Sequence, residues 1–167
     1  MATFSLDRTN ARNTGKSFER ELEMTCRGYE QAKIATISKV DPPTRTVGGG
    51  ARMRVIYQPN PFLDFIGVWT ALAGKPLFIE AKSTSTHLLP FCRDGGLTEN
   101  QCNALRRWEN AGARVGLVWQ WKEKVVAIPH PHRLDLQGAK SLRFEDFTDY
   151  LVERGTGLIV WDFLHIF

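Results

Sequence analysis

The segment Leu77–Lys82, LFIEAK, combines the pattern of a buried strand with two opposite charges. Its first three residues are bulky and apolar, as in a strand inside a sheet. Because side chains alternate between the two faces of a strand, Phe78, Glu80 and Lys82 share one face. A carboxylate and an ammonium therefore lie side by side on an otherwise apolar surface, where each requires a partner.

The preceding segment supplies a second carboxylate. Residues 62–69, FLDFIGVW, predict a strand, and a short connection joins it to residues 76–82 in a hairpin. If the turn is centred near Leu72, Asp64 faces Glu80 across the two strands, with Cβ atoms ~5 Å apart. The faces of this hairpin then carry Phe62, Asp64 and Ile66 on one side and Leu63, Phe65, Leu77 and Ile79 on the other.

This pair of carboxylates predicts a metal site. Two opposed carboxylates repel each other, and their burial is costly unless a cation compensates. Lys82 supplies one positive charge, and a divalent cation between Asp64 and Glu80 would supply two more. Carboxylate oxygens suit Mg²⁺ or Mn²⁺. The alternative is a surface Glu–Lys pair on an edge strand, with Asp64 elsewhere.

The composition is that of an ordinary globular chain. Of 167 residues, 43% are hydrophobic and 24% charged, which predicts a single domain over residues 1–167. No apolar run approaches the roughly 20 residues of a membrane helix, and the N-terminus lacks an apolar signal core. Three scattered cysteines form no CxxC pair. We therefore expect a reduced, cytoplasmic protein without membrane association.

Positive charge is concentrated in the N-terminal third. Residues 1–60 contain ten Lys and Arg against six Asp and Glu, whereas the rest of the chain is nearly balanced. Such an excess suits a segment that faces a polyanion. On charge alone, a solvated surface that happens to be basic is the alternative interpretation.

The first predicted element is a helix over residues 15–31, after a loose basic arm at 1–12. Its apolar residues recur with a period close to 3.6 and form one stripe, which consists of Phe18, Leu22, Cys26 and Tyr29. Asn13 or Thr14 would cap this helix at its N-terminus.

The remaining pattern predicts an α/β (α+β) fold with one mixed central sheet flanked by helices. Further strands are expected at 33–39, 114–121, 124–129 and 157–167, and further helices at 98–111 and 144–154. Thr98 and Gln101 form a capping-box pattern where the first of these helices begins. The last helix would turn Phe144, Phe147 and Leu151 inward.

Residues 41–51 have the composition of a loop or a projection. They contain two prolines, three glycines and Arg45, and Arg52 and Arg54 follow. This stretch is either a slack loop or a basic projection, over about 41–58, that a partner grips.

These motifs resemble the PD-(D/E)XK nuclease superfamily and, within it, the RecU-type Holliday junction resolvases. The resemblance spans about residues 10–130 and is weaker over 131–167. Its motifs are Asn13-x-Gly15-x-x-Phe18-Glu19, Lys39-x-x-Pro42, Phe78-x-Glu80-Ala81-Lys82, and Leu97 to Gln101 at the second helix. One departure is that Pro61 stands three residues before Asp64, so the literal Pro-Asp pair is absent.

The resemblance implies a restriction-endonuclease-like nuclease fold and a metal-dependent, structure-selective endonuclease. Such an enzyme resolves four-way DNA junctions by paired symmetric nicks during recombination and repair, and works as a homodimer without a small-molecule cofactor. The alternatives are another endonuclease of the superfamily, restriction-like or for repair, and a non-catalytic DNA-binding module of the same fold.

The resemblance also assigns roles to individual residues. Asp64, Glu80 and the Ala81 carbonyl would bind Mg²⁺, for which Mn²⁺ would substitute, and Lys82 would orient the attacking water and stabilise the transition state. Glu19 would reach the site from the first helix. A solvated Glu19, with Glu23 as the rival acid, is the alternative.

Gln101 has two readings of similar weight. It either hydrogen-bonds the attacking water or Lys82, or it serves only as the capping-box partner of Thr98. Contacts to DNA are expected from Arg12, Lys16, Lys39, Arg45, Arg52 and Arg54, with the 41–58 projection entering the junction. Trp119 and Trp121 share a strand face, and we expect packing in the core or a dimer interface rather than base stacking.

Overall fold

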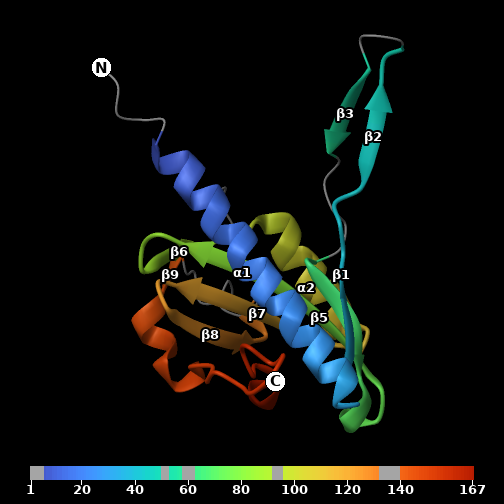
Figure 1. The fold of residues 1–167 in the computed structure, drawn as a ribbon, viewed down its shortest axis with the longest axis vertical. Helices are drawn as coiled ribbons and strands as arrows, with labels where there is room; N and C mark the ends of the chain where they lie inside the picture. The colour runs from blue at the N-terminus through green and yellow to red at the C-terminus, as the bar shows by residue number, and fades with distance from the viewer. Residues whose placement is uncertain (1–5, 50–52, 58–62, 92–95, 132–139) are drawn as a thin grey trace.

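A computed structural model describes residues 6–49, 53–57, 63–91, 96–131 and 140–167. A five-stranded mixed sheet forms its centre (Figure 1). In spatial order its strands are β1 (Thr36–Lys39), β4 (Phe65–Trp69), β5 (Lys75–Thr84), β7 (Arg114–Trp121) and β8 (Lys124–Pro129). Only β5 and β7 are parallel; the other neighbours are antiparallel. The predicted fold class, a mixed central sheet flanked by helices, is confirmed.

The two helices cover opposite faces of this sheet. Helix α1 (Leu6–Gln31) buries its apolar stripe against one face, together with Phe65 and Ile79. Helix α2 (Glu99–Asn110) packs on the other face, where Phe78 and Trp119 lie. The predicted stripe of Phe18, Leu22, Cys26 and Tyr29 is buried throughout, as expected.

The β4–β5 hairpin has the predicted register. Phe65 pairs with Ile79 and Ile66 with Phe78, across a connection that contains a 3-10 turn at Thr70–Leu72. The strand pairing begins at Phe65, and the chain bends at Asp64. Because of this bend, Leu63 lies in the core beneath α2 rather than on the face predicted for it. Phe62 lies outside the described residues.

Helix α1 begins earlier than predicted. It starts at Leu6, so residues 6–12 are helical and not a loose arm, and Asn13 and Thr14 lie inside the helix instead of capping it. Residues 6–14 contain no Gly or Pro, so nothing in this stretch stops the helix. The prediction for residues 1–5 lies outside the described part of the chain.

A two-stranded hairpin projects from the sheet (Figure 1). It consists of β2 (Thr44–Val47) and β3 (Arg54–Tyr57), which pair with each other in the described structure. Its side chains are exposed along β2 and along residues 54–56. The predicted segment 41–58 therefore contains a projection and is not a slack loop.

The region after β8 differs from the prediction. Residues 144–154 form a 3-10 helix only over Phe144–Tyr150, with Phe144 and Phe147 buried as expected. Leu151 is exposed, contrary to expectation, because residues 151–152 leave the helix and pair with β8: Leu151 bridges Val126, and the Val152 amide donates to the Val125 carbonyl.

The predicted strand at 157–167 is wrong. This segment contains one isolated bridge and a 3-10 turn at Leu164–Ile166, and hydroxyls of α1 accept hydrogen bonds from three of its backbone amides. The Thr25 hydroxyl accepts from the amides of residues 160 and 161, and the Tyr29 hydroxyl accepts from Leu164. Phe167 rests on Gly116, where a Cβ would lie 2.1 Å from its ring.

Besides β2 and β3, two more described strands were not predicted, β6 (Leu88–Pro90) and β9 (Ser141–Arg143), which pair with each other. At three residues each, both are too short for a clear alternation pattern. The first sheet strand, β1, is also shorter than the predicted range 33–39. In the described residues, no helix has the length and apolar character needed to span a membrane.

Candidate active site

Glu80 is the centre of a group of five residues, which we call the Glu80 cluster: Asp64, Glu80, Ala81, Lys82 and Gln101. Strand β5 carries Glu80 into the interface with α2, where its side chain is 1% exposed. The Lys82 ammonium lies 2.7 Å from Glu80 Oε1. The Gln101 amide on α2 donates a short hydrogen bond to the same oxygen. Two donors from two elements therefore hold one oxygen of a buried carboxylate.

Asp64 completes the cluster from the neighbouring strand. It is half-buried at the bend before β4, and its Oδ2 accepts a hydrogen bond of 3.0 Å from the Ala81 amide. This contact is possible because β4 pairing stops at Phe65, which leaves the Ala81 amide free of a β4 partner. The two carboxylates therefore meet where the hairpin ends, as the sequence predicted.

The environment of Glu80 opposes its ionisation. Burial, followed by the charge of Asp64, raises the pKa of Glu80 from 4.5 to about 8, although Lys82 acts in the opposite direction. In the protein without metal, burial and the neighbouring Asp64 therefore favour the protonated form of Glu80. A cation bound beside it would favour the ionised form and release that proton.

The cluster fits a divalent cation. Glu80 Oε2 is buried and has no hydrogen-bond partner, although its other oxygen has two. A buried, unsatisfied carboxylate oxygen is costly, and a metal ion beside it would satisfy that oxygen. Two carboxylates and a nearby backbone carbonyl form the all-oxygen donor set that Mg²⁺ prefers, with water and phosphate as further ligands.

Gln101 is the capping-box partner of Thr98, and its side chain also contacts Glu80 rather than Lys82. The side-chain Oε1 of Gln101 accepts a hydrogen bond of 2.9 Å from the backbone amide of Thr98. The Thr98 hydroxyl in turn accepts one from the backbone amide of Gln101, so the capping box is complete. The Nε2 of Gln101 meanwhile donates to Glu80. The cap that starts α2 thus also orients the side chain that contacts Glu80.

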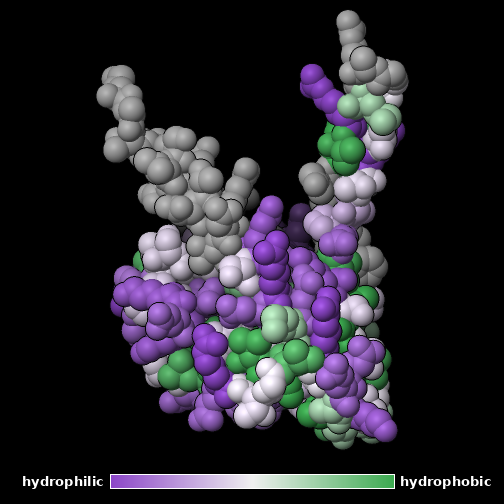
Figure 2. Space-filling model, viewed as in Figure 1, coloured by the Kyte–Doolittle hydropathy of each residue, from purple (hydrophilic) through white to green (hydrophobic). Residues whose placement is uncertain are grey.

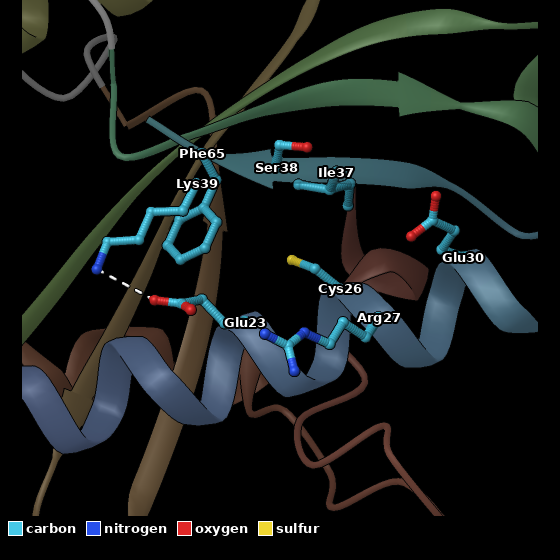
Figure 3. A pocket seen from close by; sticks show the side chains of 8 residues that line it. All are labelled: Glu23, Cys26, Arg27, Glu30, Ile37, Ser38, Lys39 and Phe65. Carbon is cyan, nitrogen blue, oxygen red and sulfur yellow. Dashed lines mark ion pairs between the residues drawn. The ribbon is translucent and has the colours of Figure 1, made fainter. Parts of the chain in front are cut away.

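Glu19 lies elsewhere, in an ion pair with Lys39. Lys39 Nζ is 2.7 Å from Glu19 and 3.1 Å from Glu23, and the second of these pairs is drawn in Figure 3. Partial burial lowers the pKa of Lys39, but the hydrogen bonds and charges of both glutamates outweigh that effect and raise it. The pair binds α1 to the end of β1.

Among the described residues, no three His, Cys, Asp or Glu side chains gather closely enough to hold a metal ion. Glu19 therefore does not join Asp64 and Glu80 in this arrangement. A hollow of about 260 Å³ lies beside Lys39 (Figure 3). Its lining consists of Glu23, Cys26, Arg27, Glu30, Ile37, Ser38, Lys39 and Phe65.

The described residues predicted to bind DNA lie on α1, on the β2–β3 hairpin and at the end of β1, where Lys39 pairs with Glu19 and Glu23. Lys16 is exposed on α1, and Arg45 and Arg54 are exposed on the hairpin. Arg12 lies in α1, and Arg52 lies outside the described residues. The hairpin also exposes apolar side chains beside polar ones (Figure 2), among them Val47, Val55 and Ile56.

Sequence reasoning missed the pairing of Lys39 with two acids of α1. The three residues were singled out separately, Lys39 for DNA, Glu19 for the site and Glu23 as its rival. Nothing in a single sequence connects a helix acid with a strand lysine about twenty residues later, since that contact depends on how α1 packs on β1. The hydrogen bond from Ala81 to Asp64 likewise depends on where pairing stops.

Known proteins resemble this chain over most of its length. The family model described as RecU, Recombination protein U, matches residues 13–166. Among solved structures, the chain is similar to a 1.6 Å structure of Hjc, a Holliday junction resolvase from the archaeal hyperthermophile Archaeoglobus fulgidus. That pair has 16% identity and a TM-score of 0.47, over 80% of this chain and 91% of the other. No protein with a curated description matches the chain.

Proposed function

The chain belongs to the RecU family of Holliday junction resolvases, and from that premise we propose that the Glu80 cluster is its active site. As a member of this family it is an endonuclease that acts on four-way DNA junctions. The observation that carries the site assignment is the buried Glu80, which has an unsatisfied Oε2 and lies beside Asp64 and Lys82.

Resolvases of this family depend on a divalent metal ion. For this chain we propose Mg²⁺, with Mn²⁺ as a substitute, held by Asp64, Glu80 and the Ala81 carbonyl. When bound, such an ion supplies Lewis-acid stabilisation of the negative charge on the reacting phosphate. Hard oxygen ligands and an open side for phosphate favour these ions over softer metals.

Lys82 has the position of an electrostatic catalyst. In phosphodiester hydrolysis, a water oxygen forms a bond to phosphorus, one ester P–O bond breaks, the water gives a proton to solvent and the leaving oxygen takes one up. The Lys82 ammonium can hold that water or a phosphate oxygen while negative charge develops. Gln101 fixes the Glu80 side chain, and the Ala81 amide fixes Asp64. Preorganisation of this kind is the main protein contribution to phosphoryl chemistry.

We further propose that the hairpin and α1 grip the branched substrate. Both project from the same side of the sheet (Figure 1), and Lys16, Arg45 and Arg54 are exposed on them. A C2 homodimer would supply two identical sites for paired nicks in opposed strands. Because the substrate is DNA undergoing recombination, the proposed location is the cytoplasm of a bacterial or phage-infected cell. Glu19 would approach the cluster only after releasing Lys39.

A panel of synthetic DNAs tests this function. We expect symmetric nicking of a four-way junction with Mg²⁺ or Mn²⁺, no nicking in EDTA, and much slower cleavage of matched duplex, fork and flap DNA. Equal cleavage of all substrates would indicate another nuclease of the superfamily. Metal-independent junction binding without cleavage would indicate a non-catalytic module.

A further inference from the structure

Two tryptophans near the end of β7 have different surroundings. Trp119 is fully buried, and its indole nitrogen donates to the Thr84 hydroxyl at 2.8 Å. Trp121, the last residue of β7, is only half-buried. The expectation of core packing therefore holds for Trp119, whereas Trp121 has a surface that a ligand can reach.

Trp121 is surrounded by cationic and aromatic side chains. Its ring lies against Phe144 at a centroid distance of 5.4 Å. Lys122 places its ammonium 4.7 Å from the ring centroid, and the His87 ring meets it edge-on at 5.9 Å. A hollow of about 390 Å³ opens here, lined by Trp121, Lys122, Glu123 and Lys124.

This hollow lies next to the Glu80 cluster along the sheet. In the parallel pairing of β5 with β7, Lys82 is opposite Trp119 and Thr84 is opposite Trp121. Paired residues point to the same face, so Trp121 shares the face of Glu80 and Lys82, two positions beyond the lysine. Two positions along a strand span about 7 Å and neighbouring strands lie about 4.8 Å apart, so a nucleotide next to a phosphate held at Lys82 can reach Trp121.

We propose that Trp121 and Lys122 form a binding site for an unpaired nucleotide of the cleaved DNA strand, with its base stacked on the indole. The site rests on the proposed function, because it needs a strand that passes the Glu80 cluster. Stacking on aromatic rings beside basic groups is how proteins hold single-stranded DNA. Lys122 leaves the ring face when the base arrives and pairs with the adjoining phosphate.

The charges around the hollow favour a nucleotide over a neutral apolar ligand. Lys122 and Lys124 are exposed on either side of Glu123, so the turn carries a net positive charge. The indole provides the flat surface that a base requires, and the ammoniums provide the phosphate contact. A base within duplex DNA already stacks on its neighbours, so the site selects nucleotides that have left the stack.

Binding of a short single strand tests this site without cleavage. The probe is fluorescein-labelled (dT)10, which forms no duplex, with fluorescence anisotropy recorded in EDTA. Trp121→Leu should weaken binding about ten-fold, and Trp121→Phe should retain most of it, because phenylalanine still stacks. Lys122→Gln, a surface change that spares the packing, should weaken binding a few-fold at low salt and less at high salt.

The chain provides matched controls at the opposite end of the sheet. Trp69 is also half-buried at a strand end and pairs with Lys75. Trp69→Leu and Lys75→Gln should leave (dT)10 binding unchanged. The proposal would be overturned if intact protein, Trp121→Leu and Lys122→Gln bound (dT)10 equally well. It would also be overturned if Trp69→Leu and Lys75→Gln lost as much (dT)10 binding as the Trp121 and Lys122 variants.

Junction nicking by the same preparations separates this proposal from the proposed function. Intact protein that nicks junctions, combined with no effect of Trp121→Leu or Lys122→Gln on (dT)10 binding, refutes only the nucleotide site. Intact protein that nicks no junction refutes the proposed function itself.

Discussion

At the scale of single residues, Glu80 explains why LFIEAK carries charge inside a sheet. A carboxylate that is 1% exposed beside another carboxylate destabilises the fold unless it is neutralised. Lys82 and Gln101 satisfy Oε1, and Oε2 is left unsatisfied. The arrangement therefore leaves one buried oxygen that a metal ion would satisfy, which supports the proposed metal site.

The raised pKa of Glu80 predicts a specific dependence of stability on pH. The folded pKa, about 8, lies above the ordinary value of 4.5, so without metal the folded state binds the proton more tightly. The contribution of protonated Glu80 to the free energy of unfolding is therefore fully present below pH 4.5, falls as the pH rises, and is lost above pH 8. Glu80→Gln cannot ionise and should not show this loss.

Urea unfolding in EDTA between pH 5 and 9 measures the effect. Glu80→Gln should become more stable than the wild type as pH rises, by up to a few kcal/mol. The exposed Glu153→Gln is the control and should follow the wild type. When Mg²⁺ replaces EDTA, the difference in stability between Glu80→Gln and the wild type at high pH should become smaller, because Mg²⁺ stabilises the wild type. Parallel curves for wild type and Glu80→Gln would show that Glu80 is not held protonated.

Replacement of Lys82 separates catalysis from charge neutralisation. If Lys82 acts on the water and the transition state, Lys82→Met should fold normally, still bind Mg²⁺ and lose about 10²–10³ in single-turnover nicking rate. Lys82→Arg should restore little activity, because a planar guanidinium cannot replace a compact ammonium. A large fall in melting temperature that Mg²⁺ fully reverses, together with near-normal nicking, would contradict the catalytic role.

The meeting of Asp64 and Glu80 was predictable, and the position of Glu19 was not. A short hairpin connection and strict alternation fix which side chains oppose each other, and both can be read from local sequence. Glu19 is placed by the packing of a 26-residue helix against an edge strand, where Lys39 competes for it. Local sequence contains no measure of that competition.

At the scale of elements, the start of α2 links helix capping to the proposed active site. Thr98→Ala removes the hydroxyl half of the capping box and should cost about 1 kcal/mol of stability with little loss of nicking. Gln101→Ala removes the other half and also the amide that holds Glu80, so it should reduce stability similarly and nicking by at least ten-fold. Melting curves and nicking rates of the two variants, measured together, distinguish the capping role from the contact with Glu80. Equal nicking by both variants would reduce Gln101 to a capping residue.

The β2–β3 hairpin is separable from the core. Its two strands pair with each other, and Thr44 lies opposite Tyr57, so a Gly-Ser-Gly linker can replace residues 44–57. The deletion should leave the melting temperature nearly unchanged but weaken the preference for junction over duplex DNA in gel-shift assays. A variant that still selects junctions as well as the intact protein would show that the hairpin is not the gripping element.

Elements with a strong local sequence pattern have the predicted structure, whereas elements that depend on distant partners differ from the prediction. Strands β7 and β8 have the predicted bounds, because apolar runs and a turn define them. The apolar composition of residues 157–167 predicts a strand, but the Thr25 and Tyr29 hydroxyls accept hydrogen bonds from three backbone amides of this segment. Side-chain partners more than 130 residues away cannot be read from local periodicity.

At the scale of the whole molecule, the fold combines the proposed acidic metal site with two projecting elements that expose Lys16, Arg45 and Arg54. Helix α1 and the hairpin extend from the same side of the sheet (Figure 1), and the Glu80 cluster forms where β4, β5 and α2 meet. Negative charge at the site would repel phosphate, so substrate binding and cleavage rest on different residues. The two should therefore respond differently to substitution.

The central claim is that Asp64 and Glu80 hold the metal at which junctions are cut. The most direct test compares Asp64→Asn and Glu80→Gln with the wild type on one synthetic four-way junction, with binding measured in EDTA and nicking in Mg²⁺. Asp64→Asn should bind more tightly than the wild type, because one repulsive charge is removed. Glu80→Gln should bind about as tightly as the wild type, because the raised pKa of Glu80 already favours its neutral form without metal. Neither variant should nick. Wild-type rates of nicking by either variant would contradict the account.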